Sequence, residues 1–275
     1  MRLGTFNLMH GRSLDDGLVH GDRLGAAIAG LGTDVLGLQE VDRSQPRSGY
    51  ADLTRIAADA MGAKDVLFVP AVVGTPGESF RPATDADDDG TGDRHFGVAL
   101  ISRFPVAHWR VTRLPAAPVR GAIVMPSPKS SPKSGLKILF IDDEPRVLIA
   151  AVVETPIGRM TIATTHLSFV PGWNVRQLRL VRRALRALPA PRILLGDLNL
   201  PGGLPWLFSG WHRLASVPTY PSPAPRVQFD HVLADGRGME RLPSVLSVAT
   251  PRLLLSDHRP LVVTLRDRPG TLKID

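Results

Sequence analysis

The sequence predicts an α/β protein, because short buried strands alternate with amphipathic helices and the strands end in polar side chains. Residues 22–31 place apolar side chains at helical spacing, and Gly32 follows them as a helix end would require. Apolar stretches at 3–7 and 34–40 flank this helix and are expected to be strands, so the chain opens as strand, helix, strand. These strands end in two polar residues, Asn7 and Glu40.

Composition points to a soluble globular protein, since 43% of the 275 residues are hydrophobic and 21% are charged. We expect one domain, residues 1–275, because neither an internal repeat nor a linker is visible. No apolar run approaches the ~20 residues that cross a bilayer, and no signal-peptide pattern is present, so a cytoplasmic location is expected. The absence of cysteine excludes disulfides, thiolate zinc sites and a cysteine nucleophile. The net charge of +7 favours an anionic partner.

Further elements follow in order along the first half of the chain. Residues 52–61 are predicted to be a helix and 66–70 a strand. Residues 74–93 are rich in Gly, Pro, Thr and Asp and are predicted to be a surface loop. The spacing of the aspartates in this segment matches a calcium-binding loop only in part, so a solvated loop is favoured. Residues 96–102 and 106–114 are expected to pair with each other around a turn at 103–105.

The second half begins with a predicted flexible insertion at 126–135 and a hairpin of strands 146–155 and 159–165. Residues 173–188 form the clearest helix, with one apolar stripe and one arginine stripe at the same spacing. A solvated outer face is favoured for the arginine stripe over a nucleic-acid contact. Residues 201–225 are predicted to be a long loop, followed by strands at 227–234 and 261–265.

The segment 192–200 indicates where the chemistry lies. Residues 193–196 are apolar or small and predict a buried strand, which delivers Asp197 and Asn199 to the same side. A carboxylate and a carboxamide at that position are costly to bury unless they bind a cation or a phosphate, although an ordinary turn is the alternative. Asn7, Glu40 and His166 also end strands, and Asp257 and His258 precede the last one, so we expect one shared cleft.

The ordered set Asn7, Glu40, His166, Asp197, Asn199, Asp230, Asp257 and His258 resembles the endonuclease/exonuclease/phosphatase superfamily over nearly the whole chain. This resemblance implies a four-layer α/β/β/α sandwich, DNase I-like, in which two packed mixed β-sheets are flanked by helices and the cleft lies at one edge. It also implies a divalent-metal-dependent phosphoester hydrolase. Such a reaction needs an activated water, a cation that neutralises the phosphoryl oxygens, and hydrogen-bond donors.

Within this scheme Glu40 is expected to be the main ligand of Mg²⁺, with Mn²⁺ as an alternative, and Asn7 and Asp257 are expected beside the metal. A strand-end salt bridge is the competing explanation for Glu40. His258 is the expected general base, because imidazole accepts a proton near neutral pH, and Asp230 would orient it. Asp197 would polarise the water, while Asn199 and His166 would donate to the phosphate. A lone His after a strand is more often only a satisfied polar residue.

Candidates for gripping an anionic substrate are His10, Arg12, Arg43, Arg94 and His95, although each is equally well explained as surface charge. Met9 replaces an acidic residue found in some nucleases of this group, which weakens an abasic-site activity in particular. A nuclease or phosphodiesterase acting on nucleic acid is favoured by the basic charge, and a monomer is expected. The alternatives are a phosphatase or phosphodiesterase acting on inositol phosphates or phospholipid head groups, and a catalytically silent anion-binding module.

Overall fold

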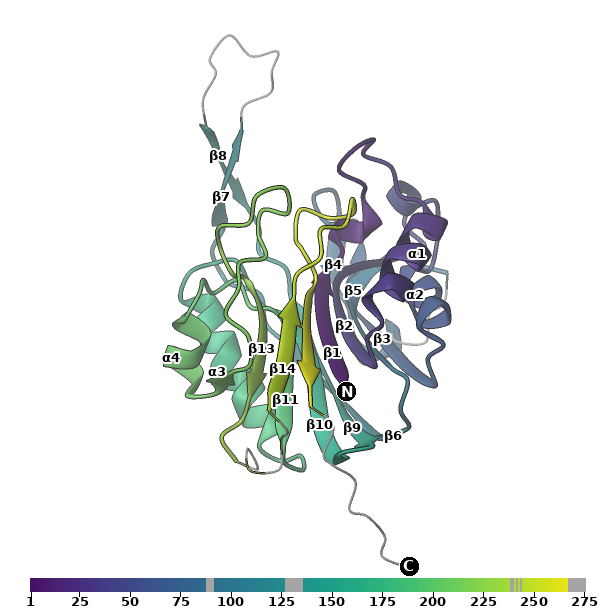
Figure 1. The fold of residues 1–275 in the computed structure, drawn as a ribbon. Helices are drawn as coiled ribbons and strands as arrows, with labels where there is room; N and C mark the ends of the chain where they lie inside the picture. Colours follow the sequence, from purple (N-terminus) through teal and green to yellow (C-terminus); the bar gives the residue numbers. More distant parts are fainter. Residues whose placement is uncertain (88–91, 127–135, 238–239, 241, 243, 267–275) are drawn as a thin grey trace, which may run out of the picture.

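Two mixed β-sheets pack face to face and carry helices on both outer sides, which makes four layers (Figure 1). The computed structural model describes residues 1–87, 92–126, 136–237, 240, 242 and 244–266. The predicted four-layer α/β/β/α sandwich is therefore confirmed. Among the described residues, no helix is long and apolar enough to cross a membrane.

The first sheet has seven strands in the order β14-β15-β1-β2-β5-β3-β4, and within it only β1 and β2 run parallel. Its strands are β1 (Arg2–Asn7), β2 (Val35–Arg43), β3 (Asp65–Gly74), β4 (Phe80–Pro82), β5 (His95–Ser102), β14 (Val245–Ala249) and β15 (Leu261–Leu265). Helices α1 (Gly21–Leu31) and α2 (Leu53–Met61) cover its outer face. Gly32 ends α1 at φ 56°, as predicted.

The second sheet has six strands in the order β12-β13-β11-β10-β9-β6, with β10 and β11 parallel. Its strands are β6 (Val106–Leu114), β9 (Arg146–Thr155), β10 (Gly158–His166), β11 (Arg192–Asp197), β12 (His212–Arg213) and β13 (Asp230–Ala234). Helices α3 (Trp173–Leu185) and α4 (Leu204–Ser209) cover it. A separate hairpin, β7 (Gly121–Pro126) and β8 (Leu136–Ile141), projects from the body (Figure 1).

Three apolar layers hold the sandwich together. The central one lies between the sheets and joins residues such as Leu3, Leu100, Ile149 and Leu195. A second layer packs α1 and α2 against the first sheet, and a third packs α3 and α4 against the second. Because each sheet is covered on both faces, its central strands are continuously apolar.

Two expectations about local structure are wrong. Strands β5 and β6 do not pair: β5 lies between β2 and β3, whereas β6 pairs with β9 in the other sheet. The chain crosses between the sheets at 103–105, where the Arg103 amide is bonded to the Asp34 carbonyl. Helix α3 ends at Leu185 rather than at 188, because the prolines at 189 and 191 disfavour helical backbone before them.

Several elements were not predicted. Strand β4 lies within the expected loop 74–93, α4 and β12 lie within 201–225, and β7, β8 and β14 also form. Most of the predicted insertion, 127–135, lies outside the described residues.

Close contact between the sheets near the cleft depends on Gly37. A Cβ placed there would lie 2.4 Å from Thr164 Oγ1 of the opposite sheet. Beside it, Gln39 donates to Thr164 Oγ1 (2.9 Å) and accepts from Thr5 Oγ1 (3.1 Å), and all three side chains are buried. This polar link fixes the carboxyl ends of β1 and β2 relative to β10.

Candidate active site

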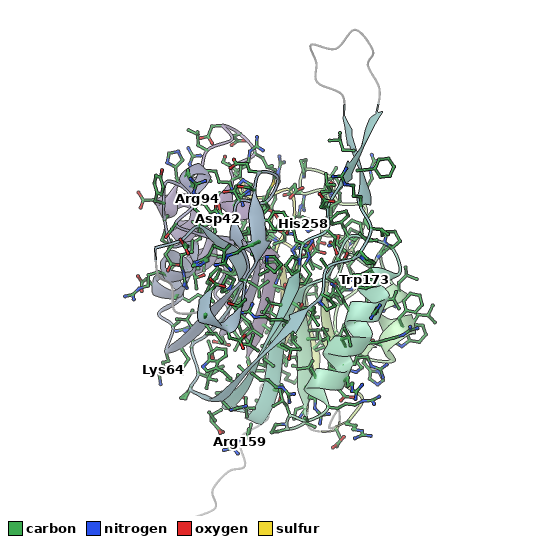
Figure 2. The ribbon with its side chains drawn as sticks, turned by 180° about the vertical axis from the view of Figure 1, so that it is seen from behind. Asp42, Lys64, Arg94, Arg159, Trp173 and His258 are labelled. Carbon is green, nitrogen blue, oxygen red and sulfur yellow. The ribbon has the colours of Figure 1, made fainter. Side chains whose placement is uncertain are left out.

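A cavity of about 550 Å³ opens where the carboxyl ends of β1, β2, β10 and β11 meet. The two parallel strand pairs, one in each sheet, bring their last residues to the same edge. The lining of the cavity includes most of the predicted metal and catalytic residues, namely Asn7, Glu40, His166, Asp197, Asn199, Asp257 and His258. Asp230 lies fully buried behind His258. Figure 2 places His258 between the two halves of the molecule.

Glu40 reaches the cavity because β2 bulges at this point. The pairing of β2 with β5 shifts between Leu38 and Val41, and Glu40 adopts φ 53°, which redirects its side chain. Asn7 Nδ2 donates to Glu40 Oε1 (2.9 Å) and to Asp197 Oδ2 (3.0 Å). One amide group therefore links a carboxylate of the first sheet to a carboxylate of the second.

His258 is held through its Nδ1 atom. Nδ1 donates to Asp230 Oδ2 at 2.8 Å, because a carboxylate only accepts, and Thr219 Oγ1 donates to the same oxygen at 2.6 Å. The His258 amide bonds to Ser256 Oγ, which itself donates to the Asn7 carbonyl. This arrangement leaves Nε2 directed toward the cavity, 3.7 Å from Asp197 Oδ2.

The charges of this group shift several pKa values strongly. Burial raises the pKa of Glu40 to about 7, and the charge of Asp257 adds to the rise. Burial likewise raises the pKa of Asp197 to about 6, although the charge of His258 opposes it. Burial alone would lower the pKa of His258, but the charges of Asp230, Asp197 and Asp257 outweigh it and raise the value to about 10. The site thus contains more buried negative charge than its side chains neutralise.

His166 lies between two hydrogen-bond donors. Arg146 Nη1, which can only donate, lies 3.3 Å from His166 Nδ1. Burial and then the charge of Arg146 lower the pKa of His166, which keeps the ring neutral. Nε2 lies 3.6 Å from Asp197 Oδ2 and 3.1 Å from Asn199 Nδ2, which also only donates and is bonded to the Leu167 carbonyl, so the neutral ring accepts from one of these two donors at a time.

Backbone strain gathers around the cavity. Among the described residues, seven other than glycine have positive φ, and four of these line the cavity: Met9, His10, Glu40 and Asn199. A fifth, Ser256, holds His258 as described above. Strained backbone of this kind persists only where surrounding contacts enforce it and is concentrated at functional sites.

The predicted substrate-binding residues divide into one that lines the cavity and four that do not. His10 is in the lining, and burial lowers its pKa to about 4. Arg12 and Arg94 are exposed outside the lining, and Figure 2 shows Arg94 on the flank away from His258. Arg43 pairs with Asp52 and stacks over Phe68, while the ring of His95 is buried elsewhere. In this conformation these four do not reach the cavity.

Other residues of the lining were not predicted from the sequence: Arg47, Glu144, Arg146, Phe169, Tyr220 and Phe229. Arg47 is fixed by two hydrogen bonds to the fully buried Asp42, at 2.9 and 2.7 Å. The ring of Tyr220 lies 4.9 Å from that of His258. A signal existed only for Arg146, which is a charged residue at the start of an otherwise apolar strand.

The carboxylate oxygens at Glu40 and Asp257 suit a hard divalent cation. Glu40 and Asp257 are carboxylates that line the same cavity, and the charge of Asp257 adds to the effect of burial in raising the pKa of Glu40. A second grouping, Asp197, Asp230 and His258, has ligand atoms within 4.8 Å of one another. We do not assign the cation there, because Asp230 Oδ2 is already bonded to His258 and Thr219.

The chain belongs to the Endonuclease/Exonuclease/phosphatase family, whose profile matches residues 4–258. Members of this family hydrolyse phosphoesters and generally depend on a divalent metal. No curated protein matches the sequence.

Solved structures share the fold at low identity. An endonuclease/exonuclease/phosphatase from Beutenbergia cavernae aligns with a TM-score of 0.64 and 22% identity, covering 97% of this chain and 71% of that one. A mannosyl-6-phosphatase from Bacteroides thetaiotaomicron aligns with a TM-score of 0.59 and 15% identity, covering 97% of this chain and 99% of that one. Sphingomyelinase C from Streptomyces griseocarneus aligns with a TM-score of 0.57 and 16% identity, again covering 97% of this chain and 99% of that one. These relatives establish the fold and leave the substrate open.

Proposed function

We propose that the chain is a divalent-metal-dependent phosphodiesterase of the nuclease type, formed by one domain. The observation that carries this proposal is the Asn7 amide, which bonds Glu40 on one side and Asp197 on the other. Asp197 in turn lies 3.7 Å from His258 Nε2. Glu40, Asp197 and His258, the proposed metal ligand, water-binding carboxylate and base, therefore border one cavity.

Glu40 and Asp257 would hold the cation, Mg²⁺ or its substitute Mn²⁺, and Asn7 would keep the Glu40 carboxylate oriented. When bound, such an ion supplies positive charge that offsets the charge developing on the phosphoryl oxygens. It would also offset the carboxylates that raise the pKa of His258, bringing that pKa toward the range where imidazole accepts a proton.

His258 would act as the general base. Nε2 removes a proton from a water that Asp197 Oδ2 aligns, and the Nδ1 proton stays shared with Asp230. Asp230 holds the ring in the tautomer that leaves Nε2 free and stabilises the imidazolium that forms. Thr219 keeps that carboxylate in place through its own hydrogen bond.

Phosphate binding would fall to neutral donors on the opposite wall. His166 and Asn199 both line the cavity, with Asn199 Nδ2 3.1 Å from His166 Nε2, and both side chains would direct a donor toward a bound phosphate. Donors fixed before the reaction stabilise the transition state without reorganisation. His10 remains a candidate substrate contact, since it lines the same cavity.

A substrate panel tests this proposal. Bis(4-nitrophenyl) phosphate, plasmid DNA, single-stranded DNA, RNA and inositol phosphates are each incubated with Mg²⁺ and with chelator. We expect metal-dependent cleavage of phosphodiesters, a loss of about 100-fold or more in Glu40→Gln and in His258→Ala, and little change in Glu154→Gln, an exposed carboxylate remote from the cavity. Unchanged hydrolysis in His258→Ala would overturn the mechanism, and turnover of inositol phosphates alone would reassign the substrate.

A further inference from the structure

Helix α3 carries a row of arginines on its outward face. Arg176, Arg179 and Arg183 lie in the helix, Arg186 follows at its C-terminal cap, and all four are exposed. Their spacing of three, four and three residues keeps them on one stripe. The apolar stripe of the same helix, Leu178, Val181 and Leu185, is buried in the third core layer. We call these four residues the α3 arginine row.

The row lacks the partners that arginines have on other faces. Several exposed arginines elsewhere pair with carboxylates, as in Arg23–Asp16, Arg55–Asp59, Arg81–Asp87, Arg120–Asp142 and Arg159–Glu154, whereas others among the described residues, such as Arg12 and Arg94, stand singly. Within the described part of the chain, no member of the row has an ion pair, and α3 itself contains no acidic residue. Asp235, at the far end of the helix, is already bonded to Arg192 at 2.6 Å.

This arrangement is unfavourable for the helix alone. Like charges three and four residues apart repel one another, and Arg176 lies in the first turn, where the helix dipole disfavours a cation. Each effect amounts to a few tenths of a kcal/mol at an exposed position, and the dipole favours Arg183 and Arg186 near the C-terminus, so the net penalty is small and is largest at the Arg176 end of the row. An anionic partner would remove it.

The row starts beside the active site. Asn174, in the first turn of α3, donates to the Asn199 carbonyl at 2.8 Å, so this end of the helix is bonded to the catalytic loop. Arg176 stacks over the Trp173 ring at 4.4 Å, which holds its guanidinium in place. Figure 2 shows Trp173 at the end of α3 toward His258.

The far end of the row borders a second cavity of about 310 Å³. Three arginines line it, Arg182, Arg186 and Arg237, together with Ser209 and the fully engaged Asp235. Three guanidinium groups and one carboxylate line this cavity, so its lining carries a net positive charge that would attract an anion.

We propose that the α3 arginine row binds the phosphate backbone of a polynucleotide whose scissile phosphate lies in the active-site cavity. This inference rests on the proposed phosphodiesterase function and adds its substrate class. The ten helical steps from Arg176 to Arg186 span about 15 Å, and the same length of duplex axis carries about four phosphates on each strand at 3.4 Å apiece. Arg182 and Arg237 would receive a further phosphate at the far end.

The test compares two triple variants with the same loss of charge. Arg179→Gln/Arg183→Gln/Arg186→Gln removes most of the row, whereas Arg23→Gln/Arg55→Gln/Arg159→Gln removes three exposed arginines from other faces. Both are made in the wild-type chain and in His258→Ala, which is used for binding. Binding of fluorescein-labelled single-stranded and duplex 20-mers is measured against salt concentration, and thermal melting checks the fold.

We expect the row variant to weaken binding about 10-fold or more and to reduce the salt slope by about two to three, because each phosphate contact contributes about one. The control should change both quantities far less, and hydrolysis of bis(4-nitrophenyl) phosphate should stay within about twofold in both. Equal weakening by the two variants would reduce the effect to net charge and overturn the proposal. Row-dependent binding to phosphatidylserine vesicles without nucleic-acid binding would also overturn it. Because binding is read separately from hydrolysis, failure of the proposed function would be seen independently.

Discussion

Glu40→Gln should make the affinity for the metal much less dependent on pH. In the metal-free protein burial raises the pKa of Glu40 to about 7, so near neutral pH a cation competes with a proton for this carboxylate. A glutamine keeps the size of the side chain and cannot bind the proton. Metal affinity in the variant should therefore be weaker at high pH and should vary less with pH.

The magnitude follows from the pKa. With a pKa near 7, a proton occupies about 99% of Glu40 at pH 5 and about 10% at pH 8. The apparent Kd for the metal should therefore be roughly 100-fold higher at pH 5 than at pH 8, a difference of about 2.7 kcal/mol. Asp197, with a pKa of about 6, leaves a residual dependence of at most about 10-fold in the variant.

Isothermal titration of Mg²⁺ and of Mn²⁺ into the full chain, from pH 5 to pH 8 at constant ionic strength, measures this directly. Repeating the titration in buffers of different ionisation enthalpy counts the released protons, and we expect close to one from Glu40 at pH 6. Glu154→Gln, an exposed carboxylate on the hairpin of β9 and β10, serves as the control. A wild-type Kd that is flat across this range, or a variant that keeps the full 100-fold change, would refute the reasoning.

Three further predictions concern stability and positioning. The folded pKa of Glu40 lies above its ordinary value, so its contribution to stability is fully present below about pH 4.5 and is lost as pH rises through about 7. Across this range the free energy of unfolding of the chelated protein, measured with urea, should fall by up to about 3 kcal/mol, and that of Glu40→Gln should fall by less. Arg146→Met should lower kcat about 10-fold with little change in KM, because Arg146 holds the His166 ring in place, and Arg146→Lys should recover part of the rate. Equal rates in the methionine variant and the wild type would contradict this positioning role. Gly37→Ala should lower the melting temperature by several degrees, whereas Gly30→Ala in α1, where nothing lies within 4 Å of the new Cβ, should leave it unchanged or raise it. A melting temperature unaffected by Gly37→Ala would show that the sheets separate at little cost.

Strand-end chemistry was predictable because it depends on local pattern. Apolar runs that stop at Asn7, Glu40, His166 and Asp197 place polar groups at one edge where the strands run parallel, as β1 with β2 and β10 with β11 do, although β2 itself bulges at Glu40 and continues to Arg43. The family resemblance supplied the ordering that made a single cleft the expected outcome, and it also implied the two packed sheets.

Sheet membership and the arginines of the site were not predictable in the same way. An apolar run such as β5 does not specify which neighbour it pairs with, so the separation of β5 from β6 required the whole fold. Arg146 enters the cavity because β9 lies beside β10, a contact between residues distant in sequence. Thr219 comes from a segment without periodic pattern, and its bond to Asp230 has no local signal.

The substrate-binding candidates show the limit of reasoning from position along the chain. Arg43 follows Glu40 by three residues, yet the bulge and the continuing strand direct it to Phe68 and Asp52. Arg47, four residues further on, reaches the cavity because η2 (Pro46–Ser48) turns the chain back and Asp42 holds its guanidinium. Charge near a catalytic residue in sequence therefore says little about where the charge lies.

A crystal structure of the full chain with Mn²⁺ and inorganic phosphate, with the metal located by anomalous scattering, tests the central claim most directly. We expect one anomalous peak in the active-site cavity, about 2.2 Å from a Glu40 carboxylate oxygen, with phosphate between it and the side chains of His166 and Asn199. A Mn²⁺ ion bound by Asp197, Asp230 and His258 with Glu40 left unliganded, or phosphate bound away from His166 and Asn199, would contradict it.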